Sequence, residues 1–172
     1  MKKKNLLNFI LIILILMIFV RLASGKPARV QVKLDGLVCT FCAYNLEKKL
    51  KRIESVEDLK ILVNAGLAEF KIKEGKSIDV DEIKKAVKDG GFTPREMFVT
   101  LKGKIEEFGG RMNLIVGDDR FILKYNEILK EIITSEKAQD KIVTVTGLVQ
   151  EERIKGHGIH PYVLEIRDFK VE

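Results

Sequence analysis

Cysteine, histidine and proline are scarce in this sequence, and tryptophan is absent. Its 172 residues include two cysteines, two histidines and three prolines. A small secreted domain held together by disulfides needs several cysteine pairs with long separations, whereas these two cysteines lie three residues apart. A structural zinc site normally has four ligands, and there is no second cysteine pair to complete one. The pair is therefore suited to two-coordinate binding of a soft metal ion or to redox chemistry.

An excess of one charge is also missing once the N-terminus is set aside. The formal net charge is +6, but residues 1–25 carry four basic residues and no acid. The rest of the chain has 27 basic residues against 25 acidic ones, a net charge of +2. Such a balance gives no reason to expect nucleic acid or an anionic membrane surface as a partner.

The longest hydrophobic run lies at the N-terminus. The first five residues include three lysines, residues 6–20 are apolar except for one asparagine, and small residues follow in the positions usual for cleavage. A helix of about 15 residues spans roughly 22 Å, which is short of the ~30 Å hydrocarbon core unless the helix extends further. We therefore expect residues 1–25 to form a helical leader, either a signal peptide or a membrane anchor. Residues 6–23 would then direct export to the periplasm or to the outer face of the cytoplasmic membrane.

Residues 28–98 have the pattern of an α+β domain. Alternating apolar residues mark a first strand over Val30–Leu34, and a helix with apolar residues at helical spacing follows. Two strands joined by a short Asn-Ala-Gly link form a hairpin. A second helix begins with Asp79 as its cap and Glu82 three residues later, ends at Gly90, and leads into a last strand. This order predicts a ferredoxin-like βαββαβ domain with both helices on one face of an antiparallel sheet.

Residues 99–172 predict a second domain made mostly of strands, and no Pro- or Ser-rich linker precedes it. Three strands, the first interrupted by Gly103, come before a short amphipathic helix around Ile128–Ile133, and two closing strands follow. The order fits a five-stranded OB-type β-barrel and resembles small OB-like domains of bacterial envelope proteins. Because a fold alone gives no function, we expect a protein-docking or spacer role.

The strongest motif is the loop Gly36-Leu37-Val38-Cys39-Thr40-Phe41-Cys42, followed by an amphipathic helix and later by Gly90-Gly91-Phe92. Over residues 28–98 the chain resembles the heavy-metal-associated domain. That family includes copper chaperones, the N-terminal domains of metal-exporting P-type ATPases and the periplasmic mercury-binding protein. The resemblance implies that Cys39 and Cys42 are metal ligands. It also implies that Leu37, in place of the usual Met, packs beneath the loop, and that Phe92 approaches it.

Two thiolates can form a complete site for a soft ion, because Cu(I) and Hg(II) bind thiolates strongly and accept low coordination numbers. A helix start near Cys42 favours the thiolate form through its unpaired N–H groups and its dipole. Cu(I) is the first candidate and Hg(II) the second. Zn(II) is less expected, because relatives that export zinc often carry an acid just before the first cysteine, where this chain has Val38; Asp35 lies nearby but at the end of the strand.

The sequence thus predicts an exported protein that chelates a soft metal ion through Cys39 and Cys42 and passes it to a protein partner, such as a metal transporter or a metal-accepting protein. The alternative is a periplasmic thiol–disulfide redox protein using the same CxxC, although the domain is short and Thr40-Phe41 offers neither Gly nor Pro between the cysteines. A structural CxxC disulfide, or a scaffold whose metal domain serves for docking, is a third possibility.

Other functions have less support in the sequence. No Ser/His/Asp set, phosphate-binding loop or functional pair of acids is evident, so we expect no enzymatic activity. His157 and His160 could form a weak second metal site, but an exposed hairpin loop is the simpler interpretation because no carboxylate or cysteine cluster accompanies them. Membrane contact is expected through the N-terminal segment alone.

Overall fold

A computed structural model describes residues 28–37, 39–135, 141–152 and 162–171 of the chain. The leader expected over residues 1–25, Val38 and the two histidines lie outside the described residues. Among the helices in the described part of the chain, none is long and apolar enough to cross a membrane.

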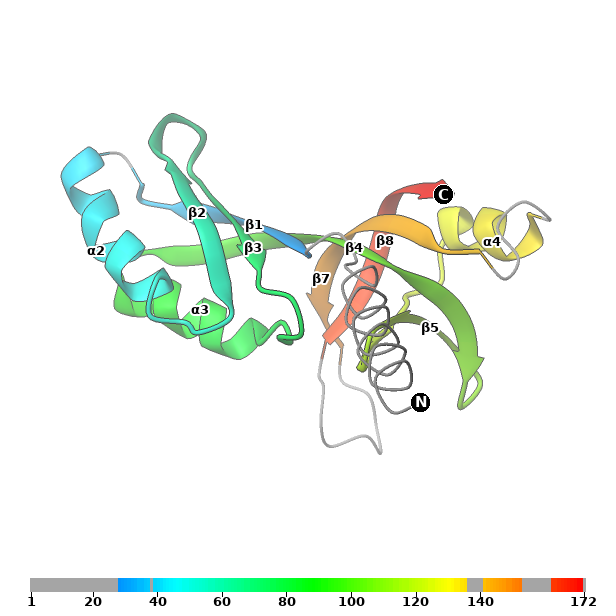
Figure 1. The fold of residues 1–172 in the computed structure, drawn as a ribbon. Coiled ribbons are helices and arrows are strands. Elements are labelled where there is room, and N and C mark those ends of the chain that lie inside the picture. Colours follow the sequence, from blue (N-terminus) through cyan, green and yellow to red (C-terminus); the bar gives the residue numbers. More distant parts are fainter. Residues whose placement is uncertain (1–27, 38, 136–140, 153–161, 172) are drawn as a thin grey trace, which may run out of the picture.

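The first half of the chain forms four strands and two α-helices, in the order that the sequence predicts. The elements are β1 (Arg29–Asp35), α2 (Thr40–Leu50), β2 (Val56–Leu62), a 3-10 turn (Val63–Ala65), β3 (Leu67–Ile72), α3 (Val80–Asp89) and β4 (Thr93–Phe108). The strands form an antiparallel sheet in the order β2-β3-β1-β4. Helices α2 and α3 contact each other on one face of this sheet (Figure 1).

Alternation and capping explain these elements. Val30, Val32 and Leu34 of β1 are buried while their neighbours are exposed or half-buried, as expected of a strand that has one face on a core. The Asp79 carboxylate accepts a hydrogen bond of 2.8 Å from the backbone N–H of Glu82, so the predicted N-cap of α3 is confirmed. Gly90 ends α3 at a place where a Cβ atom would lie 3.1 Å from Leu46 Cα, so the small residue lets the two helices approach closely.

The second half adds the remaining strands and one helix. These elements are β5 (Arg111–Val116), β6 (Asp119–Ile122), α4 (Glu127–Thr134), β7 (Val143–Glu151) and β8 (Tyr162–Val171). Strand β4 pairs with β7 over Met97–Gly103 and with β5 over Lys104–Phe108. The two halves therefore share β4, which runs without a break through the boundary that the sequence predicts between residues 98 and 99.

The closed five-stranded barrel expected for residues 99–172 is not found in the described part of the chain. The predicted order of three strands, a helix and two strands is present, but the sheet is open between β6 and β8. One isolated parallel bridge connects Leu123, just after β6, with Leu164 of β8. Strand β6 is four residues long, and the chain then turns into α4, so β6 is too short to form a ladder with β8.

Gly103 does not interrupt its strand, contrary to the sequence-based expectation. It lies inside the 16-residue strand β4, next to β5. A Cβ atom at this position would lie 2.1 Å from the carbonyl oxygen of Ile115. Glycine is required here because the β5 backbone passes too close for any side chain.

Candidate metal centre

The two cysteines lie where the chain leaves the sheet and enters α2. Cys39 has an extended backbone (φ −143°, ψ 144°) and is the N-cap of α2, and Cys42 is in its first turn. The Cys39 Sγ accepts a hydrogen bond of 3.2 Å from the backbone N–H of Cys42. Both cysteines are free thiols, and their sulfur atoms are 2.7 Å apart. The fold therefore brings both predicted ligands to one point.

The pair is open to solvent. Cys42 is exposed and Cys39 is partly exposed. Phe41, between them, is 92% exposed, and Tyr44, one turn further along α2, is 68% exposed. Two large aromatic side chains beside the thiol pair are thus uncovered, which the pattern of the sequence does not predict. A partner molecule can reach both sulfurs directly.

The two thiols differ in acidity. The pKa of Cys39 is lowered by the hydrogen bond that it receives from the Cys42 thiol and by the one from the Cys42 backbone N–H. The pKa of Cys42 is raised, because its thiol proton is held by Cys39 and because it loses some hydration. Cys39 is therefore the first of the two thiols to ionise.

Binding of a metal ion requires the sulfurs to move apart. A metal–thiolate bond of about 2.3 Å, the value for zinc, places two ligand sulfurs up to about 4.6 Å apart when the ion lies between them. The present separation is 2.7 Å. Because Cys42 is exposed and Cys39 is partly exposed, little surrounding packing opposes such a movement.

Leu37 and Phe92 lie beneath the loop, as the resemblance implies. Both are buried, with 5% and 7% of their surface exposed, and both belong to the hydrophobic core. Gly36 has a positive φ of 86°, and a Cβ atom there would lie 3.9 Å from the Phe92 ring. The Asn45 side chain donates a hydrogen bond of 3.2 Å to the carbonyl oxygen of Gly90, which ties α2 to the end of α3. The loop is thus supported from below by packed side chains.

Asp35, the carboxylate closest in sequence to the pair, has another partner. It forms an ion pair with Arg95, and this contact raises the pKa of the Arg95 guanidinium. Within the described residues, no group of three or more His, Cys, Asp and Glu side chains could hold a metal ion. Among these residues, the candidate ligands are the two sulfurs.

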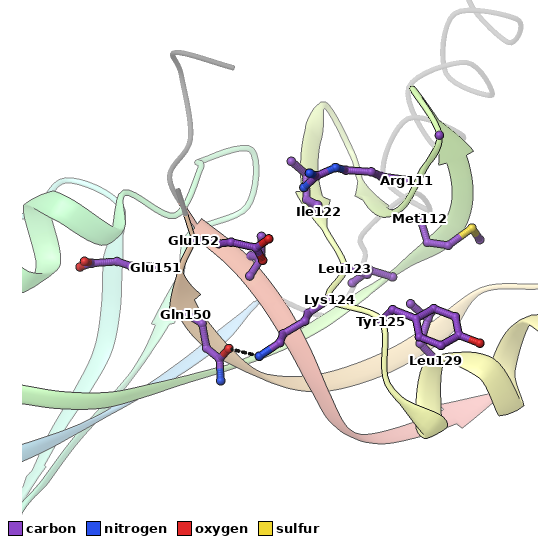
Figure 2. A pocket seen from close by; sticks show the side chains of 12 residues that line it. Arg111, Met112, Ile122, Leu123, Lys124, Tyr125, Leu129, Gln150, Glu151 and Glu152 are labelled. Atoms are coloured by element: carbon purple, nitrogen blue, oxygen red, sulfur yellow. Dashed lines mark hydrogen bonds between the residues drawn. The ribbon is translucent and has the colours of Figure 1, made fainter. Parts of the chain in front are cut away.

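A pocket of about 510 Å³ lies in the second half, near the opening between β6 and β8 (Figure 2). Its apolar lining includes Met112, Leu123 and Leu129, and charged side chains such as Arg111 and Glu152 also line it. The Lys124 ammonium donates a hydrogen bond of 2.9 Å to the side chain of Gln150 on β7 (Figure 2). No pattern in the sequence predicts this pocket, because its lining comes from residues far apart in the chain.

Comparison with known proteins gives solved structures but no sequence family. No family model matches the chain, and no curated protein matches it. The CopZ metallochaperone is 21% identical, and the match covers 39% of this chain and 98% of that one with a TM-score of 0.36. Oxidized MerP from Ralstonia metallidurans CH34 is also 21% identical, over 39% of this chain and 92% of that one, with a TM-score of 0.35.

A third similar structure is the N-terminal domain of a potential copper-translocating P-type ATPase from Bacillus subtilis in the Cu(I)-loaded state. It is 21% identical over 41% of this chain and 86% of that domain, with a TM-score of 0.37. These proteins are of the heavy-metal-associated type that the Cys39–Cys42 loop resembles, and the likeness is limited to about two-fifths of the chain.

Proposed function

We propose that this chain is a heavy-metal-binding protein that holds a soft ion between Cys39 and Cys42 and passes it to a protein partner. The observation that carries the proposal is the exposed thiol pair at the start of α2, with sulfurs 2.7 Å apart and no disulfide between them. Two convergent thiols with no carboxylate or imidazole beside them in the described residues favour a thiophilic ion of low coordination number. Cu(I) is the first candidate, Hg(II) the second and Zn(II) the least favoured.

The exposure of the two cysteines supports transfer of the metal ion to a partner and not its storage. A structural metal site is normally closed by its ligands and by the surrounding core. Here Cys42 is exposed and Phe41 projects into solvent, so a thiol of a partner can attack the bound ion. Each metal–sulfur bond to this chain is then replaced by a bond to the partner, one at a time. Similar proteins include a metallochaperone and a domain of a copper-translocating ATPase, which agrees with a partner that accepts metal.

The location and the division of the chain are also part of the proposal. The basic start and apolar run of residues 1–25 favour export across the cytoplasmic membrane, so the site would act in the periplasm or on the outer membrane face. We assign metal binding to residues 28–98. We assign a supporting or docking role to residues 99–172, with an OB-like strand order around an open sheet.

A thiol–disulfide exchange protein is the second candidate, and one observation favours it. A thiol of lowered pKa beside a second thiol is the arrangement with which oxidoreductases attack and resolve disulfides. Against it, the domain is too short for a thioredoxin-like fold, and Thr40-Phe41 lies between the cysteines.

X-ray absorption spectroscopy of the full chain, reduced and loaded with one equivalent of Cu(I) in detergent, tests the assignment. The proposal predicts that sulfur alone fills the first coordination shell, and that loading protects both cysteines from alkylation. A shell containing nitrogen or oxygen ligands contradicts the two-thiolate site. A failure to load, together with a disulfide that exchanges readily with glutathione, supports the redox candidate.

A further inference from the structure

Helix α3 of the metal-binding half is bound to the hairpin strands of the second half by a cluster of polar contacts. The Lys84 ammonium lies 2.6 Å from the Glu151 carboxylate and 4.7 Å from the centre of the Tyr162 ring. The Tyr162 hydroxyl donates a hydrogen bond of 2.5 Å to Asp81. Asp81 and Lys84 belong to α3, whereas Glu151 ends β7 and Tyr162 begins β8. We call these four residues the α3 clamp.

Lys84 is the most buried of the ion-paired lysines in the described residues, although its partner Glu151 is 67% exposed. The Lys84 side chain is 23% exposed, whereas its neighbour Lys85, which pairs with Asp89 on the same helix, is 74% exposed. One lysine thus contacts a carboxylate and an aromatic face at once, both from the other half of the chain. Burial and the contact with Asp81 raise the pKa of Tyr162 far above its usual range, so its hydroxyl stays protonated and remains a donor.

A second polar contact joins the halves elsewhere. The Ser77 hydroxyl, just before α3, donates a hydrogen bond of 2.7 Å to Asp119 at the start of β6. The α3 segment is therefore attached to the second half at two places, β6 and the β7–β8 pair.

The shared strand β4 does not by itself fix the angle between the halves. Val99 pairs with Val30 on one side and with Gly147 on the other, so one sheet continues across the junction. Sheets twist, and a single continuous strand can bend and twist about its axis. Contacts on the helical side of the sheet, away from β4, add to the resistance that the pairing of β4 with β1 and β7 gives.

We propose that the α3 clamp holds the metal-binding half in one orientation on the second half, so that the chain is a rigid arm and not two units on a flexible joint. The clamp covers the first half of α3. Helix α2 lies at the end of the molecule away from β5, β8 and α4 (Figure 1), and Glu151 extends from the pocket toward α3 (Figure 2). Given the proposed function, on which this step rests, a metal-accepting protein reaches the cysteines at the α2 end, which lies away from the second half (Figure 1).

Distance measurement between two nitroxide labels tests the clamp without any metal. The labels are placed at Lys48→Cys on α2 and Lys130→Cys on α4, both exposed, in the full chain carrying Cys39→Ser and Cys42→Ser, in detergent. We expect pulsed electron–electron double resonance to give one narrow distribution of distances between the two labels. Adding Lys84→Ala with Tyr162→Phe should broaden or shift it. The matched control, Lys85→Ala with Tyr125→Phe, should leave it unchanged, because these residues make no contact within the clamp.

Glu151→Ala provides a second, milder variant in case the double variant fails to fold, and it should also broaden the distribution. A broad distribution in the parent protein overturns the rigid arm. An unchanged distribution in folded clamp variants overturns the role of the clamp. Because serine replaces Cys39 and Cys42 in the labelled protein, neither result depends on whether the chain binds metal.

Discussion

The backbone N–H of Cys42 donates a hydrogen bond of 3.2 Å to the Sγ of Cys39, so one candidate ligand caps the helix that carries the other. The same bond that begins α2 also stabilises a thiolate at position 39. One hydrogen bond therefore both caps α2 and favours the Cys39 thiolate. Substitutions at Cys39 can separate the effect on stability from the effect on metal binding.

Replacing Cys39 should separate capping from metal binding. Cys39→Ser keeps a good N-cap, whereas Cys39→Ala leaves the helix N-terminus without a side-chain acceptor. We expect the free energy of unfolding of Cys39→Ala to be about 1 kcal/mol lower than that of Cys39→Ser, measured by urea denaturation. Both variants should lose tight binding of soft metal ions. Equal stability of the two variants would show that the cap is unimportant.

The difference in acidity predicts which cysteine reacts first. The pKa of Cys39 is lowered and that of Cys42 is raised, so near neutral pH the thiolate is found mainly on Cys39. Brief alkylation with iodoacetamide, followed by peptide mass spectrometry, should therefore label Cys39 ahead of the more exposed Cys42.

The variant Cys42→Ala tests whether the Cys42 thiol lowers the pKa of Cys39. Cys42→Ala removes the thiol donor but keeps the backbone N–H, so the pKa of Cys39 should rise toward its ordinary value. At a given pH its alkylation should then slow. Preferential labelling of Cys42 in the parent protein would mean that exposure, and not acidity, decides reactivity.

Packing beneath the loop should affect stability and affinity together. Phe92 is 7% exposed and contributes to the core under Gly36, so Phe92→Ala should lower the free energy of unfolding by about 3–4 kcal/mol. It should also weaken metal binding, because the loop loses its support. Leu37→Met conserves volume and should cost less than about 1.5 kcal/mol with no change in affinity. Thermal or urea unfolding and a metal titration of each variant provide the two measurements.

The close approach at Gly103 predicts a large penalty for a single methyl group. A Cβ atom there lies 2.1 Å from a backbone oxygen, so Gly103→Ala should destabilise the protein by about 3 kcal/mol or more. The control is Gly75→Ala, where φ is +73° and no atom lies within 4 Å of the new Cβ. Its cost should be limited to about 1 kcal/mol of backbone strain. Similar unfolding midpoints for both variants in urea would contradict the close packing of β4 and β5.

Local patterns were sufficient to predict much of the first half of the chain. Alternation predicted β1, and Asp79 with Glu82 predicted the start of α3, because each depends on residues within one element. The motif around Cys39 and Cys42 predicted which side chains would meet, since three residues of chain and one helix start determine their positions.

Features that depend on contacts between distant residues were missed. The exposure of Phe41 and the partnership of Asp35 with Arg95 depend on what the rest of the fold leaves uncovered or brings near. The number of strands does not predict the open sheet, because closure depends on whether β6 is long enough to form a ladder with β8 and not one isolated bridge. The sequence predicts a strand break at Gly103, whereas the glycine is required by a close approach to the β5 backbone that appears only in three dimensions.

The central claim is that Cys39 and Cys42 together bind one soft metal ion. An anaerobic competition titration of the reduced full chain in detergent tests it most directly, with Cu(I), Hg(II) and Zn(II) each set against a chelator of known affinity. We predict tight one-to-one binding of Cu(I) or Hg(II), much weaker binding of Zn(II), and loss of tight binding in both Cys39→Ser and Cys42→Ser while the fold is retained. Unchanged Cu(I) and Hg(II) affinity in both variants, or no tight binding of any ion by the parent chain, would contradict the claim.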